Sequence, residues 1–193
     1  MVISSRYYTA MSKLDQNRVK ELIDRLARIN SADEWAEDIN PVQWTALSYL
    51  VRANRFSRSP SQVSDFMTAT RGTVSQTLKA LARKGLVKEV RSDQDKRSIS
   101  YSVTKQGEAL FQKISTIEAT APLLNDTDMS SLLSGLEMLV RTTLHQRGLR
   151  PFGICKTCVY HRKTAQGGFC ELLDEPLSIP ETTQICHEQS EIV

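Results

Sequence analysis

Apolar residues recur at intervals of three and four positions in several stretches of the chain, which is the spacing that predicts amphipathic helices. The first stretch runs from Leu14 to Ile29. The most regular stretch runs from Met129 to Leu144, keeps a wide apolar face and ends near Gly148. We therefore expect a long helix near the N-terminus and a second one directly before residue 149.

Two further helices are predicted inside these limits. Asn40-Pro41 begins one of them, because asparagine can cap a helix and proline fits its first turn. Thr104 begins the other, which carries apolar residues as far as Ile117 and ends between residues 119 and 122. The inward positions of the helix that begins at Asn40-Pro41 are Trp44, Leu47, Leu50 and Val51.

Two short helices with clear start signals lie between residues 59 and 85. Ser59-Pro60-Ser61-Gln62 is a capping box, in which the serine hydroxyl accepts an amide hydrogen bond and Gln62 reaches back to the cap. Thr70 can cap a second helix, which stops at Gly85. Two short helices joined tightly predict a helix-turn-helix. The apolar side of the second helix consists of Val74, Leu78, Leu81 and Ala82.

Apolar and polar residues alternate in the segment that follows. The alternation covers residues 87–91 and 98–103, and a polar, charged linker joins the two segments. This pattern predicts a β-hairpin with Asp95, Lys96 and Arg97 at its tip. A hairpin directly after a helix-turn-helix is the wing of a winged helix-turn-helix.

Positive charge is concentrated in the same region. The chain has a formal net charge of +3, yet residues 58–105 carry ten Lys and Arg against four Asp and Glu. Such a local excess attracts polyanions, and a merely solvated charged face is the alternative. We expect this region to bind double-stranded DNA. The candidate contacts on the second short helix are Arg71, Thr73, Ser75, Gln76, Lys79 and Arg83.

These residue types suit different parts of a duplex. Hydroxyl and amide groups in the first turns of a recognition helix can reach base edges in the major groove. Lys79 and Arg83 suit phosphates, contacts that set affinity and register rather than sequence choice. A long cation at the hairpin tip suits the minor groove, and Asp95 can orient Arg97 through a carboxylate–guanidinium pair. An ordinary exposed charged turn is the alternative for the tip.

Together these residues resemble the MarR family of bacterial transcriptional regulators over approximately residues 10–148. The resemblance implies a homodimer with interlocking terminal helices, two winged domains that read a palindromic operator, and a small-molecule or oxidant signal that releases DNA. We expect a repressor. The matching segments are Thr73-Val74-Ser75-Gln76, Lys84-Gly85-Leu86-Val87, Asp93–Arg97 with Ser98, and Val103-Thr104-Lys105-Gln106-Gly107.

The dimer also has a basis in the residues themselves. The apolar faces of the first and last helices have more surface to bury than a small winged domain can cover. A two-fold partner would cover them, and packing on their own domain is the alternative.

All four cysteines lie between residues 155 and 186. Cys155-Lys156-Thr157-Cys158 has the spacing of a metal knuckle, and this tail has too few large apolar residues to fold on core burial alone. We expect a structural zinc ion, with a cysteine-ligated iron–sulfur cluster acting as a redox or iron sensor as the first alternative and free or disulfide-bonded cysteines as the second. His161 or His187 could replace one cysteine. The expected ligands are Cys155, Cys158, Cys170 and Cys186.

The sequence thus predicts a mainly α fold: a winged helix-turn-helix with N- and C-terminal dimerisation helices and a small metal-stapled C-terminal subdomain. The expected divisions are residues 1–40, 41–104, 105–148 and 149–193, namely an N-terminal helix with its linker, the winged domain, the C-terminal helices and the tail. Catalytic motifs, a secretion signal and a membrane span are not recognised, so we expect a cytoplasmic protein that is not an enzyme. A metal-binding interaction or electron-transfer protein with the helix-turn-helix as scaffold is the alternative of another class.

Overall fold

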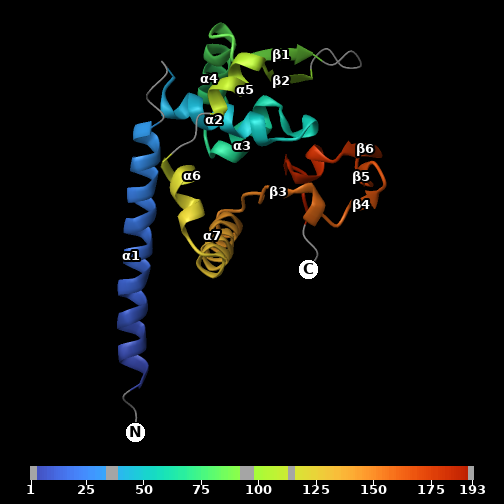
Figure 1. Ribbon diagram of the computed structural model, residues 1–193. Coiled ribbons are helices and arrows are strands. Elements are labelled where there is room, and N and C mark those ends of the chain that lie inside the picture. The colour runs from blue at the N-terminus through green and yellow to red at the C-terminus, as the bar shows by residue number, and fades with distance from the viewer. Residues whose placement is uncertain (1–3, 34–38, 92–97, 113–115, 191–193) are drawn as a thin grey trace. The chain divides into compact units, whose positions relative to one another are not determined.

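The computed structural model describes residues 4–33, 39–91, 98–112 and 116–190 (Figure 1). The chain divides into two compact units. One comprises Met1–Pro41 and Ile114–Leu123, and the other comprises Val42–Lys113 and Leu124–Val193. None of the helices within the described ranges is long and apolar enough to cross a membrane.

The first unit is built on the long helix α1, Ser4–Asp33. The predicted helix is confirmed and is longer than its apolar stripe alone indicated. The stripe is open to solvent in the single chain, where Leu22 and Leu26 are 43% and 47% exposed. The unit also contains α6, Thr116–Thr120, and the short 3-10 helix η3, Ala121–Leu123.

The core of the second unit forms around α2, Pro41–Arg52. This helix begins at the predicted proline. Leu47 and Leu50 are fully buried as expected, whereas Trp44 and Val51 are half-buried. Tyr49 is also fully buried, which the apolar pattern did not indicate. Its burial is tolerated because its hydroxyl donates a hydrogen bond of 2.6 Å to the carbonyl oxygen of Ser57.

The helix-turn-helix consists of α3, Pro60–Met67, and α4, Arg71–Arg83. The capping box is confirmed: Ser59 accepts from the amide of Gln62, and the Gln62 side chain accepts from the amide of Ser59 at 2.9 Å. Thr70 caps α4 by accepting from the amide of Thr73. After the last turn Gly85 has a φ of 71°, a conformation that glycine adopts without strain, so the helix ends where the sequence predicted.

The wing follows as β1, Val87–Arg91, and β2, Ile99–Val103, which pair antiparallel with Val87 opposite Val103. Thr104 then caps α5, Lys105–Phe111, by accepting from the amide of Gly107. The single helix expected to reach Ile117 is wrong. Helix α5 ends at Phe111, where the amide of Gln112 bonds the carbonyl oxygens of Glu108 and Leu110 and tightens the last turn, and α6 is a separate helix.

The last helix, α7, spans Asp126–Gln146 and is capped by Asn125. The amide of Gly148, which has a φ of 63°, bonds the carbonyl oxygen of His145 and closes the C-terminal end. The C-terminal end agrees with the prediction, whereas the helix begins three residues before Met129, where the apolar pattern starts. None of the described residues of α7 is buried in the single chain, so its wide apolar face is open.

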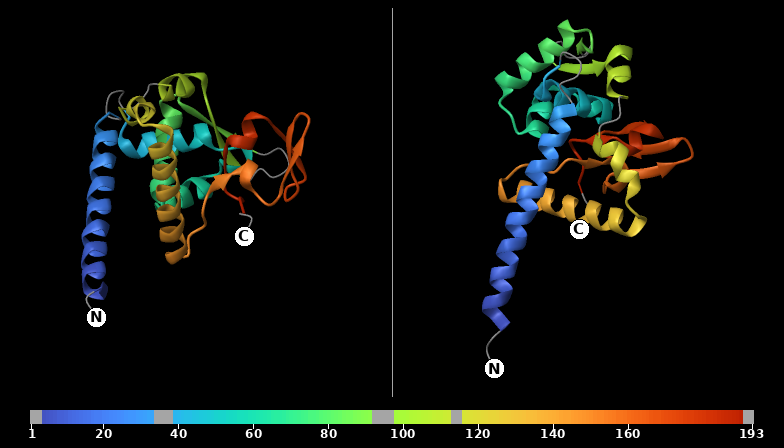
Figure 2. Two further views of the ribbon diagram at one scale, coloured as in Figure 1. Left: turned by 60° about the horizontal axis from the view of Figure 1, so that its bottom comes forward. Right: turned by 60° about the vertical axis from the view of Figure 1, so that its left-hand side comes forward.

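The tail from residue 151 is a small β structure. Strands β4, His161–Thr164, β5, Gly167–Cys170, and β6, Glu175–Ser178, form an antiparallel sheet in that order (Figure 2). A second antiparallel pair joins β3, Gly153–Ile154, to β7, Ile185–Cys186. The 3-10 helices η4, Cys155–Thr157, and η5, Pro180–Thr183, complete the tail.

Candidate nucleic-acid interface and thiol cluster

Helix α4 is held rigidly by one face. Val74, Leu78 and Leu81 are fully buried, and Thr77 on the same face is 8% exposed with its hydroxyl donating to the carbonyl oxygen of Thr73 at 2.9 Å. Helix α3 contributes Val63, also fully buried, to this core. Since a buried face fixes the rotation of a helix about its axis, the opposite face of α4 is presented in a fixed orientation.

The opposite face of α4 is polar and open. It bears three cations and no acid within residues 71–83. Ser75 is half-buried, and the Thr73 hydroxyl lies 2.9 Å from the hydroxyl of the cap residue Thr70. The exposed predicted contact residues are Arg71, Thr73, Gln76, Lys79 and Arg83.

The base of the wing is attached to the segment before α3. The amide of Tyr101, on β2, donates to the carbonyl oxygen of Arg58 at 2.9 Å. On β1, Arg91 is exposed and forms an ion pair of 3.0 Å with Glu89. The predicted tip residues Asp95, Lys96 and Arg97 lie outside the described residues.

The four cysteines come from separate elements of the tail and line one small cavity. Its volume is about 10 Å³, and Leu177 and His161 are also in its wall. A cavity of this volume is about large enough for one water molecule or one ion. Cys155 and Cys186 meet because β3 and β7 are paired, and both are buried together with Leu177.

Hydrogen-bond donors surround the sulfur atoms. The side-chain amide of Asn54 donates to Sγ of Cys155 at 3.2 Å, and the backbone amide of Ser190 donates to Sγ of Cys158 at 3.4 Å. Cys186 receives hydrogen bonds from Cys155, Asn54 and the backbone of Glu188, and these bonds lower the pKa of its thiol to about 6. The shared proton and burial raise the pKa of Cys155. Donors of this kind favour a thiolate at Cys186.

The four cysteines form no disulfide bond with one another here. Within the described residues, no three or more His, Cys, Asp or Glu side chains lie close enough together to hold a metal ion in their present positions. The structure therefore brings the predicted ligands to one cavity without drawing them together around one point.

Comparisons with known proteins place this geometry in a wider group. Residues 37–98 match the model of the MarR family. The winged helix is of the MarR type. Members of that family are DNA-binding regulators rather than enzymes, which agrees with the expectation from the sequence. No curated protein matches the chain in sequence.

Solved structures share the MarR-type fold. FabT of Streptococcus pneumoniae, in complex with DNA, has a TM-score of 0.56 at 23% identity over 70% of this chain and 99% of its own. MepR of S. aureus, in complex with DNA, has a TM-score of 0.51 at 21% identity over 65% of this chain and 96% of its own. A MarR transcriptional regulator from Methanosarcina mazei Go1 has a TM-score of 0.56 at 19% identity, with 69% and 98% covered.

The sequence did not identify the contacts that join the tail to the MarR-type winged helix. The segment Asn54–Ser57, which includes the 3-10 helix η2, Arg55–Ser57, lies between α2 and α3 and contacts the tail at several points. Asn54 and Ser57 are each only 1% exposed. Buried polar residues require hydrogen-bond partners, but the burial of these two is not visible in the sequence.

Proposed function

We propose that this protein is a DNA-binding transcription regulator that inserts α4 into the major groove. The observation that carries the proposal is the division of α4 into a buried apolar face and an exposed polar face with three cations. The MarR-family match over residues 37–98 supports it, as do the DNA complexes of FabT and MepR, which share the fold. In such an arrangement the first turns of the helix read bases.

The contact residues divide by chemistry. Gln76 offers an amide that can pair bidentately with adenine, and Thr73 and Ser75 offer hydroxyl groups. Arg71, Lys79 and Arg83 neutralise phosphates and set affinity. We further infer that Arg97, supported by Asp95 and Lys96, reaches the minor groove from the wing tip.

We infer that the protein acts as a homodimer and represses transcription from a palindromic operator. The open apolar faces of α1 and α7 support the dimer, since Leu133 and Val140 of α7 are 55% and 57% exposed in a single chain. Burying such faces against a second copy would remove a large apolar area from water. A two-fold dimer addresses half-sites about one helical turn apart, roughly 34 Å. Repression would follow where such an operator overlaps a promoter.

We also propose that the four cysteines bind one zinc ion, which stabilises the tail. The donor set suits zinc chemically, because four thiols line one cavity and amide groups donate to the sulfurs of Cys155 and Cys158. Binding requires the sulfur atoms to move closer together than they lie in the free thiol form. Zinc analysis of the purified protein tests this point, and a brown protein that contains iron would support the iron–sulfur alternative.

A small-molecule effector is a further part of the proposal. A cavity of about 550 Å³ lies between α7 and the start of the tail, lined by Leu144, Phe152 and Gln189 among others. Gln189 is 6% exposed, and its Oε1 has no hydrogen-bond partner among the described residues. A ligand with an apolar body and one donor group suits such a site. Phe152→Ala should enlarge the cavity and alter the effector response, measured as the change in DNA affinity on adding effector relative to the variant's own affinity without it.

The decisive experiment is selection of bound duplexes from random DNA, followed by fluorescence anisotropy at several salt concentrations. We expect one inverted-repeat sequence to be enriched and its affinity to fall steeply with salt, because phosphate contacts release counterions. Lys79→Ala should weaken binding, and Lys163→Ala, which changes an exposed lysine in the tail sheet, is the matched control. Failure to enrich any duplex would favour the interaction or electron-transfer alternative.

A further inference from the structure

We propose that zinc occupancy of the four-cysteine site controls DNA affinity by fixing the Asn54–Ser57 segment, on which α3 and the wing depend. This inference rests on the proposed function. It goes further by assigning to the tail a regulatory role and an effector, a thiolate-seeking divalent cation.

The first link is the side chain of Asn54, which serves the thiol site and η2 at once. Its Nδ2 donates to Sγ of Cys155 at 3.2 Å, while its Oδ1 accepts from the amide of Phe56 at 3.1 Å and caps η2. The orientation of one buried amide therefore has to satisfy both sites. A change in the position of the sulfur atoms would disturb the cap of η2.

The second link is formed by the backbone of β7. The amide of Asn54 donates to the carbonyl oxygen of Ile185 at 2.9 Å, and Ala53 and Ile185 form a parallel bridge. The amide of His187 donates to Oγ of Ser57 at 2.9 Å. The residues on both sides of Cys186 are thus bonded to the segment that leads into α3.

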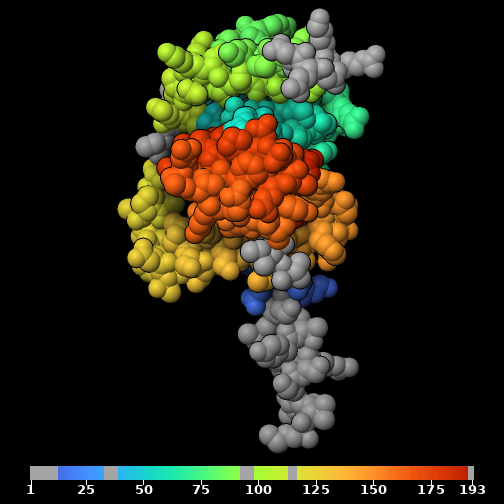
Figure 3. Space-filling view, turned by 90° about the vertical axis from the view of Figure 1, so that its right-hand side faces the viewer, coloured from blue at the N-terminus to red at the C-terminus, as the bar shows by residue number. Residues whose placement is uncertain are grey.

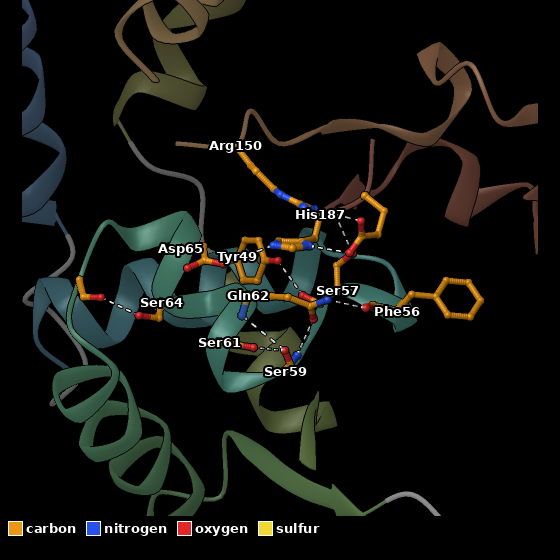
Figure 4. Close-up of polar contacts among 12 residues, drawn as sticks. Tyr49, Phe56, Ser57, Ser59, Ser61, Gln62, Ser64, Asp65, Arg150 and His187 are labelled. Carbon is orange, nitrogen blue, oxygen red and sulfur yellow. Dashed lines mark hydrogen bonds and ion pairs between the residues drawn. The ribbon is translucent and has the colours of Figure 1, made fainter. Parts of the chain in front are cut away.

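A third link consists of side chains. Arg55 pairs with Glu175 at 3.3 Å and with Glu181, and it donates to the carbonyl oxygen of Pro176 at 2.8 Å. His187 lies 3.3 Å from Asp65 of α3, next to Ser57, as Figure 4 shows. Phe152 packs edge-on against Phe66 of α3, with ring centroids 5.2 Å apart. In Figure 3 the tail, coloured orange to red, borders the cyan and teal surface of α2 and α3.

From the Asn54–Ser57 segment the contacts continue to both DNA-binding elements. Nε2 of Gln62, on α3, donates to the carbonyl oxygen of Phe56 at 3.0 Å. The guanidinium group of Arg58 donates to the carbonyl oxygen of Ala53 through two nitrogens. The carbonyl oxygen of Arg58 accepts a hydrogen bond from the amide of Tyr101 on β2. The start of the helix-turn-helix and the base of the wing are therefore held by the same few residues.

The stability of the tail depends on whatever occupies its cysteine cavity. Among the described residues, its apolar cluster consists of Cys155, Leu177 and Cys186, with Phe56 of η2 and Cys170 packed against it. So small a core cannot maintain a fold alone, and in small metal domains the free energy of metal binding is free energy of folding. Loss of the ion would loosen the tail, and Phe56 of η2 would then lose the apolar cluster against which it packs. We expect the zinc-loaded protein to bind DNA more tightly.

The experiment uses the full chain and a selected operator duplex, with DNA affinity measured by anisotropy before and after zinc removal by a chelator. We expect removal to weaken binding by a factor in the range of about 5–150, which is typical of coupled sites, and zinc re-addition to restore it. Coupling is reciprocal, so saturating operator should raise zinc affinity by the same factor. This second measurement needs no variant.

Two variants separate coupling from folding. Cys170→Ser removes a ligand and should give the weak DNA affinity of the zinc-free protein. Asn54→Ala should retain one zinc per chain, while the ratio of DNA affinities with and without zinc falls towards one. Circular dichroism checks that each variant is folded. If Asn54→Ala does not fold, Arg55→Ala takes its place, because the Arg55 side chain is more exposed and also contacts the tail.

The outcomes distinguish this inference from the function on which it rests. A protein that binds its operator equally well with and without zinc overturns the inference and leaves the DNA-binding function intact. A protein that binds no zinc, or iron in its place, also overturns it. Failure to bind any duplex in either state overturns the proposed function itself.

Discussion

Asn54 and Cys155 are 101 positions apart in the chain, yet the side-chain amide of one donates to the sulfur atom of the other at 3.2 Å. Asn54 ends the connection from α2, and Cys155 begins the metal-knuckle sequence. Because this contact is buried, its loss would leave polar atoms without partners, which costs about 1–3 kcal/mol for each group. The tail and the winged helix therefore share a buried contact within the same compact unit.

The capping box is a direct test of how α3 is held. Ser59→Ala removes the acceptor for the amide of Gln62 and should lower the free energy of unfolding by ~1 kcal/mol. Thermal or urea unfolding of the zinc-loaded protein measures it. Ser130→Ala, at an exposed site on α7, should stay within about 0.5 kcal/mol of the wild type. Equal effects of the two changes would contradict the role of the cap.

Substitution of Gln76 should change sequence preference more than overall affinity. The side chain is exposed on α4, where its amide can pair with one base. We expect Gln76→Ala to relax discrimination at one operator position per half-site, by about 1–3 kcal/mol, when all single-base variants are compared. Gln166→Ala in the tail is the control. An unchanged preference at every position would remove Gln76 from the base-reading residues.

Arg97 should behave in the opposite way. If it contacts the backbone or the minor groove from the wing, Arg97→Ala weakens binding to all duplexes about uniformly. It should also reduce the slope of log affinity against log salt by about 1. The measurement is anisotropy on the operator and on an unrelated duplex, with Arg162→Ala, on the exposed tail strand β4, as control. A loss confined to the operator would assign Arg97 to base readout.

Most helices and the wing could be predicted because their signals are local. A cap such as Ser59 or Thr70 acts on amides three residues away, and the stripes of α4 and α7 repeat within a single helix. The tail was harder. Strand β6 contains Pro176, a residue that disfavours strands in general, yet β6 is an edge strand of its sheet, where the missing amide hydrogen of proline costs nothing.

The site followed the same division. The exposure of Gln76, Lys79 and Arg83 could be deduced from helical periodicity, since it depends only on which face is buried. The role of Ser57 could not, because its oxygen accepts the amide of His187, which is 130 positions away in the chain. Contacts between distant segments leave no periodic trace in the sequence.

The apolar face of α7 provides a test of the dimer. Leu136→Glu places a charge on a face that is 40% exposed at this position in the single chain and that we expect to be buried in the dimer. Sedimentation should show a shift from dimer to monomer, since an unpaired buried charge costs several kcal/mol. Ser131→Glu, also exposed on α7, is the control. Dimers that persist in the Leu136 variant would favour packing of α7 on its own chain.

Zinc removal should make the tail susceptible to proteolysis before the winged helix. Lys156, Arg162 and Lys163 are exposed trypsin sites, but backbone in β4 that is paired with β5 is a poor substrate until it opens. With a chelator, cleavage at these sites should accelerate, while sites in α4 are cut more slowly. Mass spectrometry of the fragments over time measures both rates. Cys158→Ser should show the accelerated pattern without chelator, whereas Ser178→Ala, in β6, should keep the slow one with zinc present. Equal protection of the tail with and without zinc would mean that the sheet is stable by itself, and the cysteines would then need another explanation.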